Sequence, residues 1–298
     1  MKKHHIEEKV GRTLTTVSIS ILLIVIVAIT YFIASKGLST FFKDQINIVD
    51  FLFGTDWSPE RAEADGGRSF GAFSFIFGSF AVTIIAAIIS GPLGIGAAIF
   101  MTEIAPSWGQ KVLQPVIELL VGIPSVVYGF VGLSVIVPFF REHFDGLGFG
   151  IAAGSIVLAI MIMPTITSVA YDALKALPGN IKEASYGLGA TRWQTIAKVL
   201  IPTALPGLLT GVVLGMARAF GEALAVQMVI GNAQVLPDSM FNPASTITSV
   251  LTLEMGNTVM GSSYNNALWS LALILLLMSF FFIMLIRLLG RRNQLHGR

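Results

Sequence analysis

The sequence predicts an all-α, polytopic membrane protein with six transmembrane helices. Hydrophobic residues make up 54% of the 298 positions and charged residues only 12%, about half of the charged fraction of ordinary soluble domains. The apolar residues also gather in six runs, each long enough for the roughly 20 residues that a helix needs to cross a bilayer. A water-soluble chain of this size could not bury so much apolar surface, so we expect the six runs to lie in lipid.

The six spans are expected near residues 14–35, 73–101, 117–140, 148–170, 204–231 and 264–288. The first is too long for the apolar core of a signal peptide, and no small-residue cleavage site follows it, so it is expected to remain as an anchor. In the second, Gly91, Pro92 and Gly94 predict a break. In the third, Pro124 predicts a kink, where the hydroxyl of Ser125 would satisfy a freed carbonyl.

The fifth span is unusual because it carries two charged residues, Arg218 and Glu222. Four positions apart on a helix, they would share one face and pair, with Arg218 roughly 21 Å along the span. Charges at that depth face a protein interior or a water-filled cavity. The pair is either a staple between helices or, as we prefer, a guanidinium that lines a pathway and meets an oxyanion. On the same span, Gly207, Gly211 and Gly215 predict close approach to a neighbouring helix.

The distribution of basic residues predicts an orientation with both termini inside. With the N-terminus inside, 13 of the 19 lysines and arginines fall in inner segments and five in outer segments, while Arg218 lies in the membrane. This asymmetry agrees with the positive-inside rule and places residues 171–203 on the inner side. Of the outer segments, 36–72 is interpreted as a solvated connector rather than a docking surface, and 232–264 as a partly helical cap.

The polar stretch 171–203 contains two helix-start signals in tandem. Each is a capping box, in which a cap side chain and the side chain three residues later satisfy each other's backbone N–H groups. The two pairs are Asn180 with Glu183 and Thr191 with Gln194. Gly187 and Gly189 lie between them, where the chain must turn, and Pro202 would end the second helix before the fifth span. We therefore expect a two-helix hook on the inner side.

Several kinds of chemistry are absent from the sequence. No stretch fits GxxxxGK[ST], so the chain cannot hold a nucleotide through a P-loop of its own. It has no cysteine, which excludes disulfides and thiolate metal sites, and its four histidines all fall outside the apolar runs. No histidine lies near an embedded serine or carboxylate, as a hydrolytic site would require. We therefore expect no catalytic residue, no metal and no cofactor on this chain, and a net charge of +2 gives no sign of a nucleic-acid partner.

Two sets of motifs resemble a known family. Glu183-Ala184-Ser185, followed by Gly189 and by Val199-Leu200-Ile201-Pro202, is similar to the EAA loop of ABC importer permeases, with Ser185 in place of an alanine. The stretch from Arg218 to Glu222 (RAFGE), together with GIPSVVYG at 122–129, resembles the PstC-type permease subunit of the phosphate-specific importer. The resemblance runs from about residue 10 to residue 290.

The resemblance implies a type I ABC importer permease (MetI-like) fold in a bacterial or archaeal plasma membrane. Its parts would be a cytoplasmic tail, anchor helix and outer loop at 1–72, the permease domain at 73–290, and a basic cytoplasmic tail at 291–298. The residues that it assigns to coupling with an ATPase are Asn180, Glu183, Ala184, Gly189, Thr191 and Pro202. Arg218, Glu222 and Ser125 would line the substrate pathway.

The resemblance also implies a function and a set of partners. The chain would be a permease subunit that imports inorganic phosphate by alternating access. It would work with a second, PstA-type permease, with two PstB-type subunits that bind ATP and Mg, and with a PstS-type extracytoplasmic phosphate-binding protein. Two alternatives stay open, a permease for another oxyanion such as sulfate, molybdate or phosphonate, and an ATP-independent carrier. The second is disfavoured because we find no convincing internal repeat of spans. A sensory or scaffold role is a third possibility.

Overall fold

The computed structural model describes residues 2–62 and 67–295, with side chains for 9–62 and 67–284. Over these residues it is almost wholly helical, and it contains six helical segments long and apolar enough to cross a membrane. These segments are Lys9–Phe42, Phe73–Ile104, Ser125–His143, Ile151–Lys175, Arg192–Phe220 and Ser263–Met284. The predicted class and number of spans are confirmed. The last three residues of the expected basic tail 291–298 lie outside the described residues.

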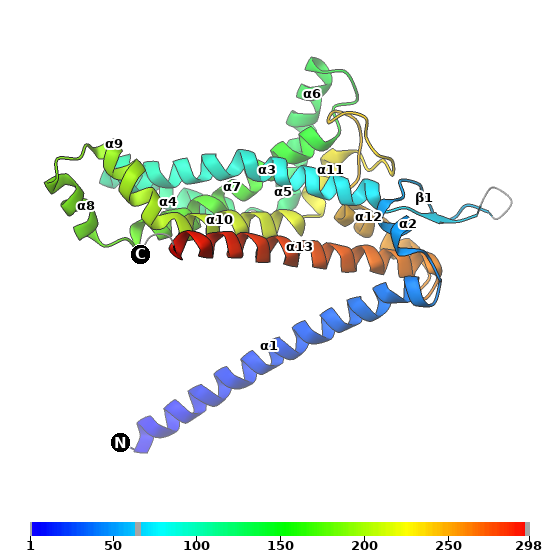
Figure 1. Cartoon of the computed structure of the whole chain (residues 1–298), viewed down its shortest axis with the longest axis horizontal. Helices are drawn as coiled ribbons and strands as arrows, with labels where there is room; N and C mark the ends of the chain where they lie inside the picture. The colour runs from blue at the N-terminus through cyan, green and yellow to red at the C-terminus, as the bar shows by residue number, and fades with distance from the viewer. Residues whose placement is uncertain (1, 63–66, 296–298) are drawn as a thin grey trace.

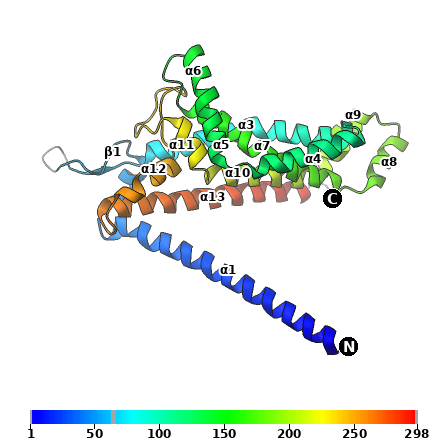
Figure 2. The ribbon, with the colours of Figure 1, turned by 180° about the vertical axis from the view of Figure 1, so that it is seen from behind.

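Five long helices form the frame of the molecule. They are α1 (Lys2–Phe42), α3 (Phe73–Ile99), α7 (Ile151–Lys175), α10 (Ile201–Phe220) and α13 (Ser263–Leu295). Helix α7 packs against α3 on one side and α10 on the other, and α10 also contacts α13. Helix α1 meets α13 near its C-terminal end and then runs away from the bundle (Figures 1 and 2). The buried core therefore centres on α7.

Shorter elements connect and flank the long helices. They are α2 (Ile48–Phe53), β1 (Trp57–Ser58), β2 (Ser69–Phe70), α4 (Ser107–Gly122), α5 (Ser125–Val131), α6 (Val137–His143), α8 (Gly179–Gly187), α9 (Arg192–Thr195), α11 (Leu224–Ile230) and α12 (Ile247–Glu254). Both termini, α8 and α9 lie toward one end, whereas β1 and α12 lie toward the other (Figures 1 and 2). Helix α12 lies in the segment 232–264, which confirms that the segment is partly helical.

The glycine stripe of the fifth span packs against α7, as predicted. A Cβ on Gly207 would lie 2.5 Å from the Cβ of Ala173, and one on Gly215 would lie 2.7 Å from Cγ1 of Ile166. At Gly211 the nearest atom is the carbonyl oxygen of Ile166, at 3.2 Å. The two backbones approach so closely that only a residue without a side chain fits between them.

The second span is unbroken at Pro92, so the predicted break is wrong. Helix α3 runs through Pro92 to Ile99 and continues as a π-helix from Phe100 to Ile104. Gly94 serves packing instead, since a Cβ there would lie 3.0 Å from Cγ2 of Ile166 on α7. We attribute the continuity to this packing, because it holds α3 against α7 where the proline removes a helix hydrogen bond.

The third span begins later than expected and is divided. Ile123 and Pro124 are both extended, with ψ near 130° and 140°, so Pro124 separates α4 from α5 instead of kinking one helix. A residue before proline is driven out of the helical region by contact with the proline ring, which explains the separation. The span therefore starts at Ser125, not at residue 117, and passes through a π-helix at 132–136 into α6. Among the described residues the Ser125 hydroxyl makes no hydrogen bond, so it does not satisfy a freed carbonyl.

The fifth span differs from its prediction at both ends. Pro202 does not end a helix, because α9, a π-helix at 196–200 and α10 form one continuous rod in which Pro202 occupies the first turn of α10. A proline is tolerated there because it directly follows a π turn, where the helix hydrogen bonds already change from the i→i−5 to the i→i−4 pattern. At the other end α10 stops at Phe220, and α11 begins only at Leu224. The predicted continuation to residue 231 is therefore wrong.

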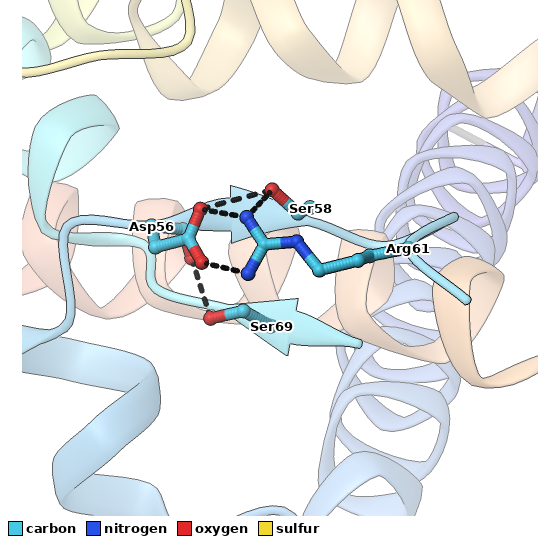
Figure 3. A network of polar contacts seen from close by, with 4 residues as sticks. All are labelled: Asp56, Ser58, Arg61 and Ser69. Atoms are coloured by element: carbon cyan, nitrogen blue, oxygen red, sulfur yellow. Dashed lines mark hydrogen bonds and ion pairs between the residues drawn. The ribbon is translucent and has the colours of Figure 1, made fainter. Parts of the chain in front are cut away.

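The described part of the segment 36–72 is more ordered than a solvated connector. Trp57 is only 5% exposed and makes edge contacts with the rings of Phe51, Phe70 and Phe75. Strand β1 pairs antiparallel with β2, and beside this pair Asp56 accepts two hydrogen bonds from Arg61 at 2.8 and 3.1 Å (Figure 3). The hydrogen bond from Ser58, followed by those from Arg61, lowers the pKa of the Asp56 carboxyl. The segment forms a small folded cap on this end of the bundle.

Candidate functional site

Arg218 lies in the last turn of α10, where the fifth span ends. Its Nη1 donates a hydrogen bond of 3.0 Å to Oγ1 of Thr165 on α7. The C-terminal end of a helix carries partial negative charge, so α10 itself stabilises the guanidinium. The side chain is only partly buried in this chain. Arg218 therefore keeps most of its donors available for an anion.

Glu222 does not pair with Arg218, and the prediction of a shared helix face is wrong. The helix ends at Phe220, so Glu222 lies in the linker before α11. No ion pair joins these two described residues. Instead Oε1 of Glu222 accepts a hydrogen bond of 3.1 Å from the backbone N–H of Ala225, and its carbonyl oxygen accepts one of 2.8 Å from the hydroxyl of Thr248. Glu222 thus fixes the start of α11 against α12.

The other predicted pathway residue, Ser125, is the first residue of α5 and is partly buried. No hydrogen bond connects it with Arg218. Sequence reasoning missed Thr165, which the structure brings to the guanidinium. The available signal was a Pro164-Thr165 pair inside an apolar run, a place where a hydroxyl needs a partner.

The first helix of the hook starts differently from the prediction. Pro178, which is extended, precedes α8 and makes no side-chain capping bond, and Asn180 is the second residue of the helix. The predicted capping box between Asn180 and Glu183 is therefore wrong. Pro178 accounts for the difference, because its fixed φ and the extended conformation suit the position just before a helix. Glu183 and Ala184 lie exposed on α8.

The second helix starts as predicted. The backbone N–H of Gln194 donates to Oγ1 of Thr191 at 3.3 Å, and the backbone N–H of Thr191 donates to Oε1 of Gln194 at 2.9 Å. This capping box is confirmed. Between the helices Gly189 adopts φ = 79°, a left-handed conformation that glycine reaches without strain. The hook is thus a defined turn between two short helices.

The tip of the hook presents apolar side chains to solvent. Leu188 is 90% exposed, Trp193 is 69% exposed and Tyr186 is 45% exposed. Aromatic residues are enriched in protein interfaces, and this group lies on α8, on the turn after it and on α9, which stand at one end of the molecule (Figure 1). The arrangement suits a surface that a second protein covers.

Two polar contacts hold α8 from beneath. Lys182 forms an ion pair with Glu103, whose side chain is only 7% exposed in the π-helix that ends the second span. The hydroxyls of Ser185 and Thr195 lie 2.9 Å apart and are buried. Sequence reasoning missed both contacts, because each joins positions far apart in the chain or on different helices. Within the described ranges no three metal-ligating side chains come together.

The chain matches a family model and several known proteins over most of its length. Residues 91–294 match the family described as "Binding-protein-dependent transport system inner membrane component". The chain is 56% identical to the "Probable ABC transporter permease protein YqgH" of Bacillus subtilis, over 98% of this chain and 94% of that protein. It is 36% identical to the "Phosphate transport system permease protein PstC" of Pasteurella multocida, again over 98% of this chain and 94% of that protein.

A solved structure shows the same fold. In a bacterial alginate ABC transporter, a chain that is 16% identical superposes with a TM-score of 0.64 and covers 96% of each chain. The six helical segments that are long and apolar enough to cross a membrane agree with these relationships. The chain therefore belongs to the binding-protein-dependent transport system inner membrane component family, as a PstC-type permease subunit of an ABC importer with the type I (MetI-like) fold.

Proposed function

We propose that this chain is a membrane permease subunit of an ATP-driven importer of inorganic phosphate. The observation that carries the proposal is Arg218, a guanidinium bonded to the hydroxyl of Thr165 and to no described carboxylate. An arginine placed in a membrane helix normally lines a cavity or a pathway, and its planar donors match a tetrahedral oxyanion. Relatives named as phosphate permeases support the choice of anion.

We further propose that the hook couples the permease to a separate ATPase. Glu183, Ala184 and the exposed tip would dock on an ATP-binding subunit, which would also hold the Mg ion. Gly189, Thr191 and Pro202 would position this surface, while Asn180 contributes as a helical residue and not as a cap. The end of the molecule with both termini and the hook would face the cytoplasm, as the charge distribution predicts.

In the proposed cycle, an extracytoplasmic binding protein delivers phosphate to a pore shared with a second permease. Closure of two ATPase subunits on ATP would move the hook and alternate the access of the pore. The partners would be of the PstS, PstA and PstB types. Arg218 would hold the anion in transit, and the hydroxyl of Thr165 would keep the guanidinium oriented when the site is empty.

Uptake of labelled phosphate tests this proposal. Cells that lack the gene are compared with and without the restored wild-type chain, in the presence of excess sulfate or molybdate. We expect restored high-affinity uptake that neither anion reduces, and loss of uptake in Arg218→Gln with the complex still assembled. Competition by sulfate or molybdate would assign another oxyanion, and normal uptake by Arg218→Gln would contradict the role of the guanidinium.

A further inference from the structure

We propose that the ion pair between Glu103 and Lys182 makes α8 move together with the inner end of the second span. This inference rests on the coupling role proposed above for the hook. The buried carboxylate of Glu103 lies beneath α8, and the docking of an ATPase does not by itself require it. Glu103 and Lys182 are therefore positioning residues, which act through the helices that carry them.

The ion pair joins two parts of the chain that are far apart in the sequence. Glu103 and Lys182 are separated by 79 positions, and the exposed fractions of their side chains are 7% and 31%. A buried carboxylate is stable only when a partner replaces the water that it has lost. Glu103 also lies in a π-helix, a widened turn that recurs at functional sites. The pair therefore fixes Lys182, which would otherwise be an ordinary surface lysine.

Helix α8 has two faces with different partners. Lys182 and Ser185, three positions apart, point inward, and Ser185 is joined to Thr195 on the rod that becomes the fifth span. Glu183 and Tyr186 are exposed on the outward side. Among the described side chains, no other hydrogen bond or ion pair leaves α8. Besides the backbone on either side of α8, a force applied to the outward face thus has two side-chain routes, to the fifth span through Ser185 and to the second through Lys182.

A cavity lies between α8 and the ends of the neighbouring spans. It has a volume of about 140 Å³ and lies beside the ion pair, and its lining includes Thr102, Gln110 and Leu174. That volume holds roughly four or five waters, so apolar packing does not join α8 to the ends of the second and fourth spans there. Displacement of α8 is transmitted to α3 by the ion pair and not by tight packing.

The test measures phosphate import and ATP hydrolysis by the intact complex in lipid vesicles. In Glu103→Gln and Lys182→Met, we expect the ATPase subunits to copurify and hydrolyse ATP, while phosphate imported per ATP falls at least fivefold. The reversed pair, Glu103→Lys with Lys182→Glu, should regain more than half of the wild-type ratio. Lys175→Met is the matched control, because Lys175 lines the same cavity but bonds to the hydroxyl of Tyr171 and not to a carboxylate.

A second measurement does not depend on the transported anion. Ile104 is 48% exposed beside Glu103, and the chain contains no cysteine. A thiol introduced by Ile104→Cys should change its maleimide reactivity on addition of ATP in the wild-type and reversed pairs, and not in the single variants. An ATP response that persists in the single variants would overturn the inference, as would an unchanged import ratio or loss of the ATPase from the single variants. A wild-type complex that hydrolyses ATP without importing phosphate would instead refute the proposed substrate, and the thiol response would then decide the inference.

Discussion

At the residue scale, the end of the fifth span at Phe220 lies between Arg218 and Glu222, so each charge is stabilised without the other. Arg218 ends one helix and bonds to Thr165, while Glu222 accepts the N–H of Ala225 at the start of the next helix. A direct ion pair would have neutralised the guanidinium and made it a poor site for an anion. The end of the helix between the two residues therefore explains how the charge of Arg218 is tolerated in a membrane segment and remains available to an anion.

Glu222→Gln should leave uptake and stability close to those of the wild type. The amide oxygen of glutamine can still accept the N–H of Ala225, so only the charge is lost, at a cost of about 1 kcal/mol or less. Glu222→Leu removes the acceptor and should destabilise the complex by about 1–3 kcal/mol. Thermal unfolding of the purified complex, together with uptake, distinguishes the variants. If Glu222→Gln lost uptake as fully as Arg218→Gln, the two residues would act as a pair after all.

Gly189→Val should weaken association with the ATPase. The left-handed conformation of Gly189 costs about 1–2 kcal/mol for a residue with a side chain, and a β-branched residue is disfavoured further. No atom lies within 4 Å of the Cβ position, so backbone strain alone is responsible. Copurification of the ATPase measures the effect. Gly187→Ala is the control, because Gly187 ends α8 in equally open space without a positive φ, and it should associate normally.

The sequence was informative about which residues matter and less so about how they contact each other. The Thr191–Gln194 box depends on local spacing and was predictable, whereas the Asn180–Glu183 box has the same spacing and does not form. Pro178 decided that difference by fixing where α8 begins. The Arg218–Thr165 bond joins positions 53 residues apart, and no local pattern encodes such a contact.

At the scale of the elements, the structure is organised by the close contact of α7 with α10 and α3. Glycines on both neighbouring helices bring their backbones against α7, and Ile166 on α7 contacts Gly94 on one side and Gly215 on the other. The small-residue pattern was predictable because it repeats every four residues. The end points of the spans were not, because the prolines at 92, 124 and 202 have three different outcomes: α3 continues through the first, α4 ends before the second, and the third lies in the first turn of α10.

Gly207→Ala should destabilise the permease by about 1–3 kcal/mol, the usual cost of overpacking. Its new methyl group would lie 2.5 Å from the Cβ of Ala173, so α10 must move away from α7. A shift of the thermal midpoint in detergent measures the loss. Gly96→Ala on α3 meets no atom within 4 Å and should be neutral or slightly stabilising. Equal midpoints for the two variants would show that α7 and α10 are less closely packed.

At the scale of the whole molecule, the two ends of the long axis differ in character. One end carries both termini and the hook, and the other carries the aromatic cap around Trp57 and the segment with α12 (Figures 1 and 2). The six-span class followed directly from composition and run length. The folded state of the cap did not, because its aromatic residues are spread over segments that only the bundle brings together.

Labelling with membrane-impermeant maleimide checks the orientation of these ends. Because the natural chain has no cysteine, Leu188→Cys and Val235→Cys each introduce a single thiol at an exposed position, 90% and 59% exposed in the wild type. In intact cells or protoplasts we expect modification at position 235 and not at 188, with the reverse in inverted vesicles. The opposite pattern would place the hook outside and would be incompatible with a cytoplasmic ATPase partner.

The π-helices at 100–104, 132–136 and 196–200 have a consequence for how this chain can change in evolution. A π turn holds one residue more than the α turn that it replaces. Gaining or losing one residue there rotates the helix beyond it by about 100° without interrupting it. The π-helix at 196–200 therefore sets the direction in which Trp193 faces relative to the fixed contacts of α10. Insertion or deletion of one residue at this turn would rotate the hook toward a different partner, while the membrane bundle would stay unchanged.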